Sequence, residues 1–351
     1  MKIFIYRLMR DQINSPGAVL LKVILKIISY FYGVLIVVWN KIYDIGLARK
    51  HKMNVPVISI GNLTLGGTGK TPFTAYLASM IKNTYNKKVS ILIRGYGDDE
   101  WKMLEAKLPG INVLKGKDRV GTARKAINDF HSDCIILDDG FQHRRLARDL
   151  DILLIDSKDG FGNGSLFPRG VLREPESSAK RADLTVFTKA DFGKDNLIKL
   201  RINLSGKYKK HDSLEMLYKP AGLSDLLFTK KKELDYLSGK KVVALSAIAN
   251  PEYFAYMIKR LNATIVASFE FQDHYNYTMA DLKNIFSEST QKNASIIVTT
   301  EKDSIKIKNL NLEELKKPGI EFLTLEINSE ITKNKEKLIA RLDSIFPGQR
   351  S

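Results

Sequence analysis

A glycine-rich segment that ends in Lys70 and Thr71 has the clearest chemical signature in this chain of 351 residues. It follows a short apolar run, precedes a stretch with helical spacing of apolar residues, and contains Gly66, Gly67, Thr68 and Gly69. A glycine-rich turn between a strand and a helix presents backbone N–H groups at the positive end of the helix dipole, which suits a polyphosphate. We predict that all six residues bind a nucleotide, with the Lys70 ammonium at the β/γ-phosphates and the Thr71 hydroxyl on magnesium.

The match to the standard phosphate-loop pattern is imperfect. Thr64 occupies the position of the first glycine of G-x-x-x-x-G-K-[ST], although Gly66 and Gly67 supply flexibility nearby. The plain alternative is an ordinary strand-to-helix turn. Gly-Lys-Thr between a strand-like and a helix-like stretch favours nucleotide binding.

Carboxylates follow another apolar run, at Asp138 and Asp139, and Gln142 and His143 come directly after them. Phosphoryl transfer needs a carboxylate that positions the metal, usually at the end of a neighbouring strand. We predict that Asp138 joins Thr71 as a magnesium ligand and that Asp139 is catalytic. Gln142 and His143 are predicted to contact the substrate. The alternative is an acidic turn without a chemical role.

Apolar runs that alternate with helical stretches must position these motifs. Five of them are nearly continuous, as in buried parallel strands: Val55–Ile60, Val89–Ile93, Cys134–Leu137, Asp151–Ile155 and Leu184–Phe187. A second set of strands and helices begins near residue 241, after a lysine-rich stretch, 207–219 and 230–232, that we expect to be a linker. This pattern predicts an α/β fold of the P-loop NTPase type, a mostly parallel sheet with helices on both faces, plus a smaller C-terminal α/β lobe.

Charge and composition narrow the function classes. The net charge is +17, with 44% hydrophobic and 27% charged residues, which excludes a disordered or collagen-like chain. Cys134 is the single cysteine, so neither an internal disulfide nor a cysteine-based zinc site is possible. No nucleic-acid recognition motif accompanies the basic charge, so we expect no nucleic-acid partner.

The first 45 residues are basic and contain the apolar run Ala18–Trp39. On a helix, Lys22, Lys26, Ser29 and Gly33 would form one narrow polar stripe, and the rest of the circumference would be apolar. This pattern favours a helix seated in a membrane surface, with the lysines reaching the headgroups. A true span, a buried core helix and a secretory signal are the alternatives, although the run lacks a small-residue cleavage site.

The motifs also occur in a familiar order. The chain resembles the tetraacyldisaccharide 4'-kinase family, the lipid A 4'-kinases, from about residue 15 to about residue 345. The segments that carry the resemblance are 61–72, Arg94-Gly-Tyr96, 137–143, 148–151, 161–164, Leu172-Arg-Glu-Pro175, Asp273-His274 and Thr300-Glu-Lys-Asp303. It implies ATP-dependent phosphorylation of the 4'-hydroxyl of a tetraacylated glucosamine disaccharide 1-phosphate, which gives lipid IVA. It also implies a site at the cytoplasmic face of a bacterial inner membrane.

The resemblance implies further residue roles. Asp99 matches the family aspartate that pairs with a histidine of the second lobe, and His274 matches that histidine; together they would take the proton of the sugar hydroxyl. Arg173 and, as a weaker match, Arg119 would bind substrate phosphate oxygens. Because the loop before Asp99 is short, Asp98 competes with it for the pairing role.

We therefore predict three segments: an N-terminal membrane-associated helix (1–45), a P-loop ATP-binding domain (46–215) and a C-terminal α/β lobe (216–351), in a monomer. The rival hypothesis is a GTP-dependent metallochaperone or targeting NTPase. It is supported by Thr188-Lys-Ala-Asp191, which matches the guanine-reading pattern [NT]-K-x-D. The partner pattern D-x-x-G is absent, because Leu137 stands three residues before Gly140.

Overall fold

The computed structural model describes residues 2–95, 99–207, 212–310 and 319–348. The chain divides into two compact units. Unit 1 comprises Met1–Gly95, Leu108–Leu217 and Ile331–Ser351, and unit 2 comprises Tyr96–Lys107 and Tyr218–Glu330. Two strands pass from one unit into the other, namely β7 (Asp212–Asp225) and β12 (Glu321–Lys333).

Unit 1 contains the predicted parallel sheet, in the order β7-β6-β5-β1-β4-β2-β3. Its strands are β1 (Val57–Gly61), β2 (Val89–Ile93), β3 (Asn112–Lys115), β4 (Cys134–Asp138), β5 (Leu150–Asp156), β6 (Leu184–Thr188) and the first part of β7. All these neighbours pair in parallel, and β1 lies between β4 and β5. Every residue of β1, β2, β4, β5 and β6 is buried, as their continuous apolar runs predict.

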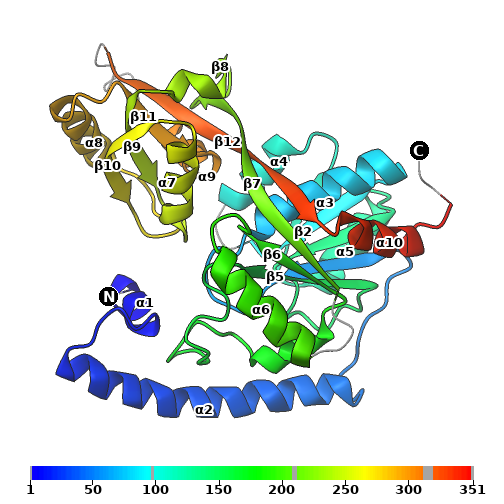
Figure 1. Ribbon diagram of the computed structural model, residues 1–351. Helices are drawn as coiled ribbons and strands as arrows, with labels where there is room; N and C mark the ends of the chain where they lie inside the picture. The colour runs from blue at the N-terminus through cyan, green and yellow to red at the C-terminus, as the bar shows by residue number, and fades with distance from the viewer. Residues whose placement is uncertain (1, 96–98, 208–211, 311–318, 349–351) are drawn as a thin grey trace. The chain divides into compact units, whose positions relative to one another are not determined.

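Helices cover this sheet because each presents an apolar side. Helix α6 (Lys194–Lys207) packs Leu197, Leu200 and Leu204 against residues of β5 and β6 (Figure 1). Helix α5 (Arg119–Asn128) packs Val120, Ala123 and Ala126 against residues of β1, β2 and β4. The remaining helices of the unit are α1 (Lys2–Met9), α2 (Pro16–Asp44), α3 (Lys70–Tyr85), α10 (Lys335–Ile345) and a short 3₁₀ helix, Glu176–Arg181.

Unit 2 is a smaller α/β assembly. Its strands lie in the order β10-β9-β11-β12-β7, with β8 (Lys231–Lys232) antiparallel to β7. They are β9 (Lys241–Ser246), β10 (Thr264–Glu270), β11 (Ile296–Thr300) and parts of β12 and β7. The helices are α4 (Asp99–Lys107), α7 (Pro251–Arg260), α8 (Met279–Gln291), α9 (Glu301–Ile307) and a 3₁₀ turn, Leu234–Leu237.

The segment 207–219, predicted as a linker, is largely strand. Residues from Asp212 onward form β7, which pairs in parallel with β6 and continues into unit 2. The charged residues scattered through β7 and the Pro220-Ala-Gly222 interruption hid the strand pattern. The expected linker thus contains a strand that passes from unit 1 into unit 2.

The domain boundaries also differ from those predicted. Residues 96–107, placed in the P-loop domain by the sequence, cluster with unit 2. The cause is an anchor at the end of α4, where the Lys107 ammonium donates to both Glu301 carboxylate oxygens at 2.9 and 3.0 Å and to the Ile327 carbonyl at 2.6 Å. Residues 331–351, predicted in the C-terminal lobe, return to unit 1.

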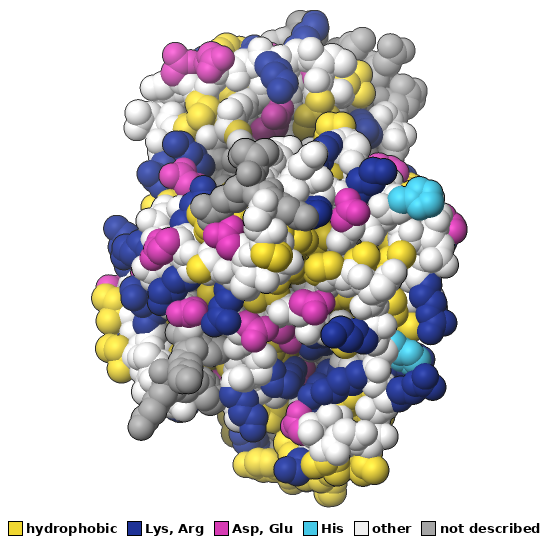
Figure 2. Space-filling model, turned by 90° about the vertical axis from the view of Figure 1, so that its right-hand side faces the viewer, with side chains coloured by type: hydrophobic (Ala, Val, Ile, Leu, Met, Phe, Trp, Pro, Cys, Tyr) yellow, Lys and Arg dark blue, Asp and Glu magenta, His cyan; other side chains and the backbone are white. Residues whose placement is uncertain are grey.

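Helix α2 has two different faces. Among the described helices, it alone is long and apolar enough to cross a membrane, and only 11% of that apolar window is buried. The exposed side chains are mostly aliphatic and aromatic, including Val19, Leu20, Val23, Ile24, Ile27, Ile28, Phe31, Val34, Leu35 and Val38. Figure 2 shows hydrophobic side chains gathered along the lower edge, where α2 runs in Figure 1.

The polar stripe of α2 faces the protein and not the lipid headgroups, so the predicted outward-reaching lysines were wrong. Lys22 pairs with Asp11 at 2.8 Å, and Lys26 donates to the Ser165 hydroxyl at 3.2 Å. Ser29 and Gly33 are buried. The polar stripe is thus used for docking α2 onto unit 1.

Candidate active site

The glycine-rich segment lies between β1 and α3, at the carboxyl ends of the central parallel strands. Gly61, the last residue of β1, approaches Phe141 so closely that a Cβ would lie 2.6 Å from its backbone nitrogen. Gly69 precedes α3 with φ +84°, a left-handed conformation that glycine adopts without strain. The predicted strand–loop–helix context of the phosphate loop is present.

Buried side chains hold the loop from behind. The Asn62 amide donates to the Thr68 hydroxyl at 2.9 Å, and the Thr188 hydroxyl donates to the Thr68 carbonyl at 3.0 Å. The Lys189 ammonium donates to the Gly67 carbonyl at 3.0 Å and pairs with the Asp156 carboxylate. Because a peptide carbonyl and the following N–H point in opposite directions, fixing the Thr68 carbonyl orients the Gly69 N–H.

Lys189 supports the phosphate loop, although in the sequence it belongs to the rival guanine-reading pattern. Its side chain is only 4% exposed and its charge is matched by Asp156, the last residue of β5. The signal that could have found this pair is a lysine and an aspartate at the ends of two neighbouring apolar runs.

Asp139 lies between two cationic side chains, those of Lys70 and Arg173, at this edge of the sheet. It follows β4 with φ +52°, an uncommon conformation for a non-glycine residue. Its carboxylate lies 3.6 Å from the Lys70 ammonium and accepts from Arg173 Nη1 at 3.0 and 2.9 Å. Burial raises the pKa of Asp139, but the charges of Lys70 and Arg173 lower it by more. The pKa of Asp139 therefore lies below its usual value, and the carboxyl is ionised.

Asp138 and Thr71 are the two predicted magnesium ligands. Asp138 is buried at the end of β4, where one carboxylate oxygen accepts from the Thr74 hydroxyl at 3.2 Å and from the Asp139 N–H at 3.0 Å. Thr71 is in the first turn of α3. A carboxylate and a hydroxyl suit Mg²⁺, which takes few protein ligands and keeps several waters. The described residues contain no group of three or more His, Cys, Asp or Glu that would form an all-protein metal cage.

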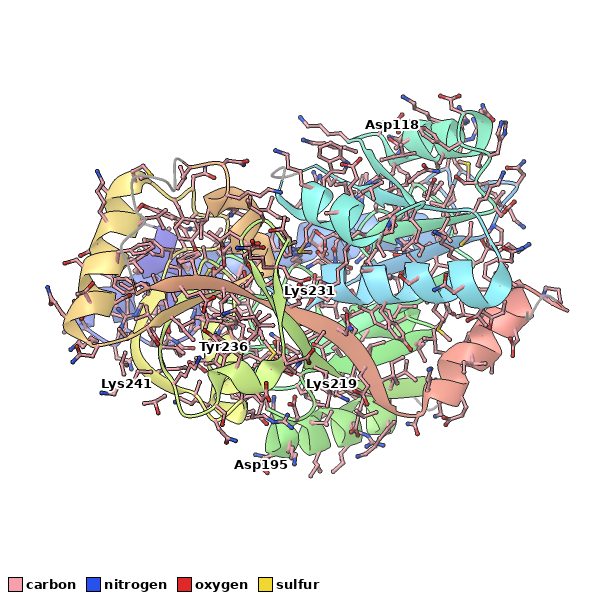
Figure 3. The ribbon with its side chains drawn as sticks, turned by 90° about the horizontal axis from the view of Figure 1, so that it is seen from above. Asp118, Asp195, Lys219, Lys231, Tyr236 and Lys241 are labelled. Carbon is pink, nitrogen blue, oxygen red and sulfur yellow. The ribbon has the colours of Figure 1, made fainter. Side chains whose placement is uncertain are left out.

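Arg119 is buried, which differs from its predicted contact with substrate. It is the first residue of α5, after the N-cap Asp118 that Figure 3 labels. Its guanidinium, in a residue 2% exposed, donates to the Asp138 carbonyl at 2.9 Å and to the Leu92 carbonyl. This geometry makes Arg119 a support for the ends of β2 and β4.

Gln142 and His143 differ in environment. The Gln142 amide donates to the Asn62 carbonyl at 3.0 Å and to the Glu174 carboxylate at 2.9 Å. Glu174, which the sequence analysis did not single out, is 2% exposed and belongs to the Leu172-Arg-Glu-Pro175 motif. Burial and the neighbouring arginines lower the pKa of His143 to about 4, so it is neutral at pH 7.

His274 is in unit 2, between β10 and α8. Its side chain is 42% exposed, with φ +64°, and its Nε2 lies 3.4 Å from the Lys302 ammonium and 3.8 Å from an Asp273 oxygen. Asp99 is the first residue of α4 and belongs to the same unit, so the two predicted partners are not divided between units. The side chain of Asp99 and all of Asp98 lie outside the described residues.

Known proteins resemble this chain over most of its length. The family profile of tetraacyldisaccharide-1-P 4'-kinase (LpxK) matches residues 21–346. A tetraacyldisaccharide 4'-kinase of Syntrophus aciditrophicus is 37% identical over 359 aligned residues, covering 94% of each chain, and one of Halothermothrix orenii is 32% identical, covering 90% of this chain and 91% of that protein. The crystal structure of LpxK from Aquifex aeolicus in complex with ATP has a TM-score of 0.72 at 30% identity, covering 93% of this chain and 99% of that one.

Proposed function

The chain belongs to the tetraacyldisaccharide-1-P 4'-kinase family, and from that premise we propose which of its residues carry out the reaction. It is a lipid A 4'-kinase that transfers phosphate from ATP to the 4' position of a tetraacylated disaccharide 1-phosphate. The observation that carries the assignment of roles is the ionised Asp139 between Lys70 and Arg173, beside the phosphate loop.

ATP binds with its β- and γ-phosphates on the loop that ends at Thr71. The Lys70 ammonium offsets negative charge on the transferred group, which is the main contribution that a protein makes to phosphoryl transfer. Thr71 and Asp138 would hold Mg²⁺, which would neutralise phosphate charge. Arg173, already paired with a carboxylate, presents the donors that a substrate phosphate requires.

His274 acts as the general base. The 4'-hydroxyl oxygen attacks the γ-phosphorus, its proton passes to the His274 imidazole, and the bond to the β-phosphate oxygen breaks to release ADP. Asp99 fixes the tautomer of that imidazole. Asp139 keeps Lys70 and Arg173 close together before the phosphates arrive.

Helix α2 seats the enzyme on the cytoplasmic face of the inner membrane. Its exposed aliphatic face would enter the acyl region, and each fully buried aliphatic side chain contributes about 1.5–3 kcal/mol. Arg49, Lys50 and Lys52 follow the helix and favour an anionic leaflet. The predicted interfacial helix and its alternative, a true span, would both have this exposed apolar face.

The test is transfer of label from [γ-³²P]ATP to a tetraacylated disaccharide 1-phosphate in mixed micelles, with and without Mg²⁺. We expect a labelled lipid only with Mg²⁺ present. GTP in place of ATP tests the rival reading of Thr188-Lys-Ala-Asp191. Because Lys189 is engaged by Asp156 and the loop, we expect GTP to be the poorer donor. A clear GTP preference that disappears in Asp191→Ala would overturn this assignment.

A further inference from the structure

We infer that helix α2 positions the phosphoryl-transfer centre, because Tyr32 and Asn40 hold the segment Arg173–Glu174 from its outer side. This inference rests on the proposed function and adds a second task to the helix that carries the exposed apolar face. Tyr32 and Asn40 act through other residues, so they are positioning residues and not catalytic ones.

The first connection runs through the backbone of Arg173. The Tyr32 hydroxyl donates to the Arg173 carbonyl at 2.8 Å, and the Arg173 N–H donates to the Leu63 carbonyl at 2.7 Å. Residue 173 is therefore held between α2 and the strand-to-loop segment that begins the phosphate site. From this fixed backbone the guanidinium reaches Asp139. A shift of α2 would therefore move the backbone of Arg173 and, with it, the guanidinium.

The second connection runs through the buried carboxylate of Glu174. The Asn40 amide donates to one carboxylate oxygen at 2.7 Å, and Gln142 donates to the other at 2.9 Å. Gln142 also donates to the carbonyl of Asn62, directly after β1. Three hydrogen bonds thus join α2 to the start of the phosphate loop. Arg181 also donates to both carboxylate oxygens, at 2.7 and 3.1 Å, so the Glu174 carboxylate keeps a charged partner while Asn40 and Gln142 tie it to α2 and to the loop.

The helix is docked closely enough for these bonds to be rigid. Gly33 lies so near Leu166 that a Cβ would be 2.7 Å from its Cδ1. At the C-terminal end, Arg144 donates to the Asn40 carbonyl at 2.8 Å and pairs with Asp44 at 2.7 Å. Asn40 is therefore held in place when it donates to Glu174. A helix that served only as an anchor would need an exposed apolar face and no such inward contacts.

The experiment compares Tyr32→Phe and Asn40→Ala with the matched control Tyr30→Phe. Tyr30 is on the same helix and 64% exposed, so its variant loses a hydroxyl outside these two connections. For each protein we would measure kcat and KM for the micellar acceptor and for ATP, sedimentation with phosphatidylethanolamine/phosphatidylglycerol vesicles, and Tm. Loss of one hydrogen bond predicts a kcat lower by about fivefold for Tyr32→Phe. Because Arg181 still pairs with Glu174, we expect a loss of about the same factor for Asn40→Ala.

A positioning role requires that kcat falls at saturating acceptor while vesicle sedimentation stays at the wild-type level and Tyr30→Phe remains fully active. Wild-type kcat in both variants would show that α2 is only an anchor and would overturn the inference. A loss that disappears at saturating acceptor, or that follows a loss of vesicle binding, would also overturn it, because delivery would then explain the effect. Wild-type protein that labels no lipid overturns the proposed function, and the inference with it, whereas an active wild type with active variants overturns the inference alone.

Discussion

The side chains behind the phosphate loop are buried and joined to one another, whereas the side chain of His274 lies at a turn of unit 2 and is 42% exposed. Asn62 and Thr188 are fully buried, and Lys189 is 4% exposed within an ion pair. His274 Nε2 lies 3.4 Å from the Lys302 ammonium and 3.8 Å from an Asp273 oxygen. Donors that stabilise charge act best when they are fixed before the reaction. A general base must instead meet a large acceptor and release its proton to solvent after each turnover.

The largest expected effect tests the rigid half of this comparison. Lys70→Ala removes the cation that faces Asp139 and the transferred phosphate, so kcat should fall by about 10²-fold or more. Steady-state transfer of labelled phosphate measures it, with Tm as a check on folding. Lys82→Ala is the matched control, because Lys82 is on the same helix and donates to the Pro109 carbonyl. Near-wild-type turnover of Lys70→Ala would exclude this loop as the phosphate site.

The exposed half is tested by His274→Ala, Asp99→Ala and the double variant. General-base catalysis contributes about 10²-fold or more, so His274→Ala should lose about that factor in kcat. Residues that act as one unit are strongly non-additive, so the double variant should be little slower than the slower single variant. Both residues belong to unit 2. Effects that multiply would show that the two residues serve separate steps.

A smaller effect is expected behind the loop, where stability and function can be separated. Lys189→Met leaves the buried Asp156 carboxylate without its charge partner, so Tm should fall. Adding Asp156→Asn removes the uncompensated charge and should restore much of Tm. The Gly67 carbonyl still lacks its donor, however, so KM for ATP should stay raised by about fivefold to tenfold.

The exposed Lys199→Met serves as the control for this pair, since it changes a lysine of α6 at the surface. If KM for ATP recovers together with Tm in the double variant, Lys189 has only a structural role. That outcome would weaken the comparison, because the buried side chains would then stabilise the fold without orienting the loop.

The sequence predicted the parts of this structure that depend on local pattern. The buried strands beside Lys70 and Asp138 were visible because each is a continuous apolar run. The docking of α2 was not visible, because an exposed polar stripe and a docked one have the same spacing. Lys189 and Glu174 were missed for a related reason: a charged residue shows its burial only when its partner, distant in sequence, is brought beside it.

Long-range pairing also explains the error on β7. A strand with charged residues and an internal proline lacks the apolar run of its neighbours, and it is held by parallel pairing with β6. The burial of Arg119 was equally hidden, because the Asp138 and Leu92 carbonyls that accept from it lie on two other strands. The family resemblance identified these segments as important, but it did not show which of their side chains face inward.

The smallest expected effect concerns His143, near the phosphate loop, and how much the folded protein loses stability as the pH falls. Burial, and then the charges of Arg119, Arg148 and Arg145, lower the pKa of His143 from 6.5 to about 4. Between about pH 6.5 and pH 4, His143 is therefore protonated in the unfolded chain but neutral in the folded protein. The stability associated with neutral His143 is complete above pH 6.5 and is lost as the pH falls towards 4.

The variant His143→Asn removes this term, so its Tm should fall less than that of the wild type between pH 7.5 and pH 5, by a difference of about 2 °C. The exposed His131 of the same unit provides the control, because His131→Asn should leave the acid sensitivity of Tm unchanged. Equal losses of Tm in wild type and His143→Asn would mean that the His143 ring can be protonated in the folded protein. The phosphate side of the molecule would then be more open to water than its burial indicates, and its contrast with the His274 turn would shrink accordingly.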